Sequence, residues 1–320
     1  MLGRTANDLF WLSRYVERAE NIARLIEVGF RIVLVPRGDQ SLDAGTLQHD
    51  WSSTLQSACC EDLYLEKHTG LTTQEVVNFL VFDASNPSSI RTCLATARRN
   101  ARAQRTALTR EMWECLNSSW IEFEAIDPEN MTSSALLKLL DWVKERSAAY
   151  RGALLNTILR NDTFYFSQLG TFLERSDNTA RILDVKYFVL LPRPEMVGSV
   201  VDNAQWGAIL RSVSAHRSYR WVYKDTYHAA GIADFLILNC QMPRSLCSCY
   251  GEIYAALEGL ENLYKKDVAC TQTARETRNG LMSGSIDSIV SAGLHEFLIE
   301  FVAGNNVLGS EISADYHFTE

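Results

Sequence analysis

Residues 15–28 read Tyr15-Val-Glu-Arg-Ala-Glu-Asn-Ile-Ala-Arg-Leu-Ile-Glu-Val28, and residues 172–185 read Phe172-Leu-Glu-Arg-Ser-Asp-Asn-Thr-Ala-Arg-Ile-Leu-Asp-Val185. The Glu-Arg dipeptide, the asparagine and the later arginine are identical in the two stretches, while apolar neighbours exchange for similar residues. In the first stretch Ile22 and Ile26 continue an apolar stripe at helical spacing. Each stretch therefore predicts a long amphipathic helix.

Two further blocks repeat in the same order and at nearly the same offset. Glu174 follows Glu17 by 157 residues, Trp206 follows Trp51 by 155, and Pro243 follows Pro87 by 156. Repetition at a fixed offset is the mark of an internal duplication. The blocks predict two homologous halves, residues 1–160 and 161–320, packed as one compact unit.

The composition favours an all-α helical bundle built from those two halves. Only six prolines and 17 glycines interrupt 320 residues, and no alternating strand pattern of useful length appears. Pro87 and Pro243 are each expected in the first turn of a helix. The predicted helices span residues 5–35, 45–59, 71–82, 88–117, 133–160, 165–191, 203–224, 231–240, 243–265 and 285–305. The predicted linkers are residues 37–44, 192–201 and 271–284.

Charge and hydropathy exclude several classes of function. A net charge of −8 gives no basic surface for nucleic acid. No apolar run reaches the roughly 18 residues of a membrane span, and no apolar signal segment opens the chain, so we expect a cytoplasmic protein without membrane contact. In that compartment the eight cysteines are expected to be free thiols.

The repeated polar residues are the main site candidates. Glu17, Asn21 and Arg24 fall within a sector of about 60° opposite the apolar stripe, with an arginine at its flank, and the second copy repeats this arrangement. One interpretation is a solvated face held by ordinary ion pairs. The favoured one is a composite polar cluster, where the two helices meet, that binds a ligand or fixes the packing. Its members are Glu17, Arg18, Asn21, Arg24, Glu174, Arg175, Asn178 and Arg181.

The same motifs carry a resemblance to a known family. The duplicated Glu-Arg dipeptide, Leu9-Phe-Trp-Leu-Ser-Arg-Tyr15, Ala97-Arg-Arg-Asn-Ala-Arg102 and Glu111-Met-Trp-Glu-Cys-Leu-Asn117 together resemble the bacterial alpha-E family over essentially the whole chain. The resemblance implies association with ATP-grasp-type ligases, transglutaminase-like proteins and proteases in systems that make or modify peptides. It implies no established catalytic residue.

Three functions follow as expectations. The leading one is a helical accessory protein of an ATP-grasp amide-bond-forming system that contributes the Glu/Arg site. The second is an amidoligase- or transferase-type enzyme in which Glu17 or Glu174 is the general base. The third is a purely structural interaction protein, whose motifs are sealed in the helix packing.

A secondary anion-binding candidate is an arginine stripe, Arg91, Arg98, Arg102 and Arg105, expected on one helix face. The alternative, an exposed basic face or partners for the glutamates of another helix, is favoured over it. Neither a metal nor a cofactor is expected. The chain lacks the Glu-x-x-His repeat of carboxylate di-iron bundles and has no Gly-rich phosphate loop.

Overall fold

The protein is helical throughout the part of the chain that the structure describes. The computed structural model describes residues 1–33, 44–188, 200–224 and 227–318. These residues form fifteen helices and no strand, so the predicted all-α fold is confirmed. The helices are α1 (Gly3–Val33), α2 (Ala44–Ser57), α3 (Glu61–Leu65), α4 (Thr73–Val81), α5 (Ile90–Ala103), α6 (Arg110–Glu124), α7 (Ser133–Thr157), α8 (Asp162–Phe188), α9 (Val200–Ser212), α10 (His216–Tyr223), α11 (Ala229–Ile237), α12 (Leu246–Tyr264), α13 (Ala269–Ser283), α14 (Ile286–Ala292) and α15 (Leu294–Asp315).

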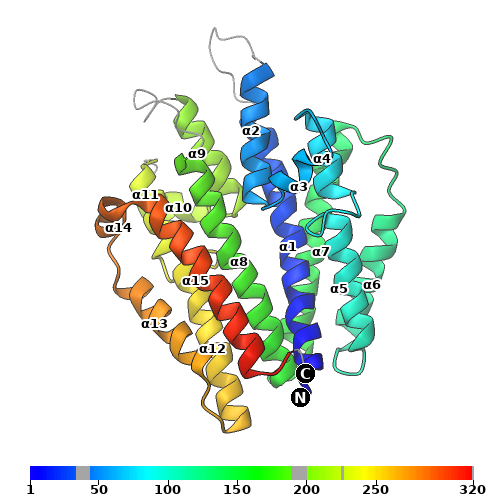
Figure 1. The fold of residues 1–320 in the computed structure, drawn as a ribbon, viewed down its shortest axis with the longest axis vertical. Helices are drawn as coiled ribbons and strands as arrows, with labels where there is room; N and C mark the ends of the chain where they lie inside the picture. Colours follow the sequence, from blue (N-terminus) through cyan, green and yellow to red (C-terminus); the bar gives the residue numbers. More distant parts are fainter. Residues whose placement is uncertain (34–43, 189–199, 225–226, 319–320) are drawn as a thin grey trace.

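The two long helices that carry the repeated stretches lie side by side at the centre of the molecule. Figure 1 shows α1 and α8 rising in the same direction, with α5 and α7 packed on α1 and with α12 and α15 packed on α8. The N-terminal amino group of Met1 lies 3.4 Å from Oδ2 of Asp162, which places the starts of both helices together. At Gly170 a Cβ atom would lie 2.1 Å from the carbonyl oxygen of Phe10. Glycine therefore lets the two backbones approach closely.

The order of elements is similar on the two sides of this central pair. Trp51 in α2 and Trp206 in α9 are both buried, each with 1% of its surface exposed. Ser89 caps α5 and Ser245 caps α12, and each side chain accepts the amide hydrogen three residues later. The prolines lie two residues before these caps rather than in the first turn. The tandem duplication and the division into residues 1–160 and 161–320 stay predictions, with which this order agrees.

Two predicted helices are wrong because each is broken. The predicted helix 88–117 ends at Ala103, and α6 begins at Arg110 after Thr109, whose side chain accepts from the amide of Met112. The predicted helix 203–224 is interrupted because Ser214 has φ of 57° and the amide of Ala215 donates to the carbonyl of Leu210. That hydrogen bond across a left-handed residue ends α9.

The C-terminal assignments also change. The predicted linker 271–284 is mostly helical, since α13 runs to Ser283 and buries Cys270, Ala274 and Leu281 on one face. The predicted helix 285–305 is split into α14 and α15 at Gly293, which has φ of 112°. Helix α3 was not predicted. The predicted linkers 37–44 and 192–201 fall almost entirely outside the described residues, as do the predicted ends of the first and sixth helices.

The free-thiol prediction is wrong for two cysteines. Cys240 and Cys247 form a disulfide, with their Cα atoms 5.0 Å apart. The chain turns tightly between α11 and α12, where the amide of Ser245 donates to the carbonyl of Met242, and this turn brings the two thiols together. The other six cysteines are free.

The apolar side chains of the helices form a core that extends through both halves. It includes Leu9, Ile26, Leu173 and Leu257, none more than 1% exposed. Burial of such residues is the main stabilising contribution to the bundle. Among the described helices, none has both the length and the apolar character that crossing a bilayer requires.

Candidate functional site

The two Glu-Arg motifs meet where α1 packs against α8. Arg18 donates to Glu174, with Nε 2.5 Å from Oε1 and Nη2 3.0 Å from Oε2. Arg175 donates to Glu17 in the same way, at 2.9 Å and 3.0 Å. The side-chain amide of Asn21 donates to the backbone carbonyl of Glu174 at 3.4 Å. Each motif's arginine thus binds the glutamate of the other motif, in the fork geometry that suits a carboxylate.

One group of charges around these pairs is mostly buried, and Arg151 is its most exposed member at 22%. Glu17 and Glu20 have side chains that are 1% and 0% exposed. Arg151 lies 2.9 Å from Glu17 and 2.5 Å from Glu20, and Arg244 lies 3.0 Å and 2.5 Å from the same carboxylates. We call this group the sealed cluster; its members are Glu17, Glu20, Arg24, Arg151, Arg175 and Arg244.

The sealed cluster holds its carboxylates ionised. Burial alone would raise the pKa of Glu17, but Arg175, Arg244 and Arg151 hold that pKa well below its usual range. The pKa of Glu20 is also lowered, because Arg244 and Arg151 outweigh burial and the repulsion of Glu17. A general base requires a pKa close to the working pH. The sealed cluster is therefore suited to holding helices together rather than to moving protons.

Three members of the sealed cluster, Glu20, Arg151 and Arg244, were not predicted from the sequence, and the two arginines are the least expected. Arg244 directly follows Pro243 at the start of α12, and Arg151 lies in α7, far from both motifs in the chain. Neither belongs to a stretch that repeats as Glu-Arg does. The sequence held no signal for them, because the need for additional cations appears only once Glu17 and Glu20 are known to be buried together.

The second group of charges, around Glu174, reaches an open space. We call it the open cluster; its members are Arg14, Arg18, Glu174, Asp177 and Arg181. Arg14 Nε donates to Glu174 at 2.8 Å, and Arg181 donates to both oxygens of Asp177, at 2.6 Å and 3.2 Å. Burial would raise the pKa of Glu174, but Arg18 and Arg14 lower it to about 2.

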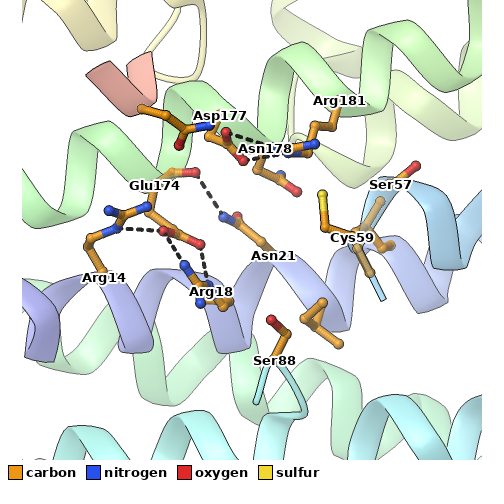
Figure 2. A pocket seen from close by; sticks show the side chains of 14 residues that line it. Arg14, Arg18, Asn21, Ser57, Cys59, Ser88, Glu174, Asp177, Asn178 and Arg181 are labelled. Atoms are coloured by element: carbon orange, nitrogen blue, oxygen red, sulfur yellow. Dashed lines mark hydrogen bonds and ion pairs between the residues drawn. The ribbon is translucent and has the colours of Figure 1, made fainter. Parts of the chain in front are cut away.

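A pocket of about 170 Å³ opens beside this cluster, between α1 and α8. Its walls hold three arginines and two carboxylates of the open cluster, together with Asn21, Asn178, Ser88 and Cys59. Figure 2 shows these side chains arranged around one space, with those from α1 and α8 facing each other. The pocket is therefore lined by residues of both repeated motifs.

Asn178 is the residue of this pocket whose hydrogen bonding is incomplete. It is only 5% exposed, and its Nδ2 atom is buried without a hydrogen-bond partner. An unsatisfied buried donor costs about 1–3 kcal/mol. Its counterpart Asn21 uses the same atom to bind the Glu174 carbonyl. Asn178 therefore adds to the pocket wall a residue with a buried donor that has no partner.

Six of the eight predicted site residues fall into the two clusters, and the two asparagines, Asn21 and Asn178, line the pocket. Arg24 belongs to the sealed cluster: it pairs with Glu20 at 2.7 Å and also binds the backbone carbonyl of Ser212 and the hydroxyl of Ser214. Arg181 and Asn178 line the pocket. The motifs therefore meet as expected, but as two unequal sites rather than one, and their role in binding stays a prediction.

The secondary arginine candidates do not converge. Arg98 donates to Asn117 at 2.9 Å, Arg102 is exposed, and Arg105 lies over the ring of Trp113. Arg105 also lies past the end of α5 at Ala103, so the expectation that the stripe shares one helix face is wrong. This arrangement agrees with the alternative of an exposed basic face.

No group of three or more metal-binding side chains of the right types is found among the described residues. Nδ1 of His295 lies 2.5 Å from Oδ1 of Asp184. Cys59 lies in the pocket wall, but burial raises the pKa of its thiol. A neutral thiol is a poor nucleophile. The chemistry that the pocket offers is therefore hydrogen bonding and charge.

Comparison with known proteins identifies one family. The Alpha-E family model, described as a predicted alpha-helical domain with a conserved ER motif, matches residues 1–317. No curated protein and no solved structure matches the chain.

Proposed function

This chain belongs to the Alpha-E family, and from that premise we propose that it is a helical accessory protein of an ATP-grasp amide-bond-forming system. In this proposal the open cluster is its ligand-binding site and the sealed cluster fixes the geometry of that site. The protein binds and presents a ligand, and the partner enzyme supplies the chemistry.

One observation carries this proposal. The pocket between α1 and α8 is lined by Glu174, Arg18 and Asn178, which come from both copies of the motif. Convergent polar groups in a cavity that is open to ligands are the usual form of a small-molecule site. Arg18 and Glu174 already neutralise each other at 2.5 Å, so the site is held in shape before a ligand arrives.

Binding is favoured over base catalysis by the state of the two glutamates. The pKa of Glu174 is about 2, since Arg18 and Arg14 outweigh burial, and Glu17 has no contact with solvent. A carboxylate this acidic accepts a proton poorly at neutral pH. The open pocket supports a binding protein over a purely structural one.

A structural role for the other half of the site is favoured by the sealed cluster. Glu17 is 1% exposed and accepts from Arg175 across the seam between the helices. Such buried pairs specify packing when every member is satisfied. We assign the two copies of the motif different tasks: the sealed copy orients the helices, and the open copy binds.

The ATP-grasp-type ligase is proposed as partner because the family resemblance implies it and because the chain has no Gly-rich phosphate loop of its own. A transglutaminase-like protein is proposed as a further member of the system. The test is recovery of the tagged chain, at native expression and under gentle washing, followed by mass spectrometry. An unrelated helical protein with the same tag is the control. We expect an ATP-grasp protein to be enriched over that control; repeated recovery of the chain alone contradicts the proposal.

A further inference from the structure

Ser88 and Arg244 take matching places in the two halves of the chain. Each follows a proline and precedes the serine that caps a helix, α5 or α12. The Arg244 side chain is 7% exposed and fills the space against Glu17 and Glu20. The short side chain of Ser88 lies in the pocket wall beside the open cluster (Figure 2). The pocket is therefore the counterpart of the space that Arg244 fills.

The charge of this space favours an anion over a second arginine-like group. Three arginines and two carboxylates line the pocket, which leaves one positive charge in excess. Both carboxylates already accept from arginines, Glu174 from Arg14 and Arg18 and Asp177 from Arg181. A cation placed here would meet an uncompensated positive charge, whereas a monoanion would balance it.

Arg244 illustrates what a cation meets at the matching place. Its pKa lies below the usual value, at about 10, because burial and the neighbouring Arg24 and Arg175 outweigh the attraction of Glu17 and Glu20. The sealed cluster is already rich in positive charge. The open cluster resembles it without the added arginine.

The unpartnered donor and the pocket volume further restrict the chemical class and the size of the ligand. Nδ2 of Asn178 is buried and lacks an acceptor, and each open-cluster arginine has further N–H groups besides those that bind Glu174 or Asp177, which suit an oxygen acid. A volume of about 170 Å³ is smaller than the roughly 300–1,000 Å³ of sites for drug-sized ligands. The space suits a small acid group and a short side chain.

We propose that this pocket binds a carboxylate, either that of a free amino acid or that of the C-terminal residue of a peptide. The inference rests on the binding role proposed above and names its ligand. The carboxylate accepts from Asn178 and from N–H groups of the open-cluster arginines. A dianion such as phosphate is disfavoured, since it would exceed the single positive charge beside Glu174 and Asp177.

Cys59 provides a direct readout, because this residue is exposed and lies in the pocket wall; the raised pKa of its thiol slows alkylation but does not prevent it. The rate of its alkylation by iodoacetamide is measured by mass spectrometry with four probes: L-alanine, N-acetyl-L-alanine, N-acetyl-L-alanine amide and inorganic phosphate. We expect one or both carboxylates to slow the reaction about tenfold at saturation, because a bound ligand fills the cavity. Protection by L-alanine alone identifies a free amino acid, and protection by N-acetyl-L-alanine identifies a peptide end. The amide and phosphate should have little effect.

Three variants test whether the protection of Cys59 comes from a ligand bound in this pocket. Asn178→Ala removes the unpartnered donor and should raise the half-protecting concentration about tenfold, the value of one charge-assisted hydrogen bond. Ser88→Phe should fill the pocket with an uncharged side chain, so that carboxylates give no further protection. Ala84→Phe places the same side chain at an exposed position of the same loop and should behave as wild type. If Ser88→Phe does not fold by circular dichroism, Asn178→Ala decides the matter.

Equal protection by the amide, protection by phosphate alone, or unchanged binding in Asn178→Ala overturns the carboxylate assignment. Recovery of the ATP-grasp partner is scored separately. If the ATP-grasp partner is recovered but carboxylates do not protect Cys59, only the carboxylate inference is overturned. If carboxylates protect Cys59 but no partner is recovered, the carboxylate inference is supported and the accessory role is overturned.

Discussion

Glu17→Gln removes the central negative charge of the sealed cluster and keeps the shape of the side chain. Glu17 is 1% exposed and lies 2.9 Å from Arg175, 2.9 Å from Arg151 and 3.0 Å from Arg244. Glutamine would leave these arginines facing Glu20 as their remaining carboxylate. Removing one member of a buried ion pair costs about 3–5 kcal/mol. We expect a loss of about that size, which is a large share of the 5–15 kcal/mol that stabilises a typical protein.

The measurement is urea unfolding at about pH 7, followed by far-UV circular dichroism. Glu114→Gln is the matched control, because Glu114 pairs with Arg110 while their side chains are 56% and 83% exposed. That control should lose less than about 1 kcal/mol. In a double variant, Arg175→Met should cost less than it does alone, since the two residues interact directly. A loss in Glu17→Gln as small as that of Glu114→Gln would refute the argument that the cluster is buried and coupled.

Three other outcomes follow from the structure. Folding lowers the pKa of Glu174 from 4.5 to about 2, so this carboxylate contributes about 3 kcal/mol of stability. That contribution is complete above about pH 5 and is lost as the pH falls through about 2. In a plot of unfolding free energy against pH, Glu174→Gln should weaken the fall in stability at acid pH, and an unchanged fall would contradict this. Gly170→Ala should cost about 1–3 kcal/mol or more in thermal unfolding, because the Cβ would lie 2.1 Å from a carbonyl oxygen, whereas Gly152→Ala, with nothing within 4 Å, should be neutral or stabilising. Arg102→Ala should change the free energy of unfolding by less than about 0.5 kcal/mol, since the side chain is exposed; a larger loss would restore the stripe as a site.

The long helices were predictable because their signal is local. The apolar stripe through Ile22 and Ile26 predicts α1, and its repeat predicts α8, from spacing alone. The breaks at Ser214 and Gly293 escaped prediction because a single residue with positive φ ends a helix without changing the apolar pattern around it. The disulfide was not predicted for a similar reason, because the composition does not indicate the turn that brings Cys240 and Cys247 together.

The repeated Glu-Arg residues were identifiable from the sequence because identical polar positions recurred among exchanging apolar ones. The amino-acid pattern alone therefore identified the repeated polar residues and the helices that carry them, but not Arg14, Glu20, Arg151, Asp177 or Arg244. Only the tertiary structure decided that the two copies are unequal. Residue 244 is an arginine that fills the space against Glu17, and residue 88 is a serine that leaves a pocket beside Glu174. That difference depends on which loop packs over which carboxylate, a contact between residues more than 80 positions apart, and local spacing carries no information about it.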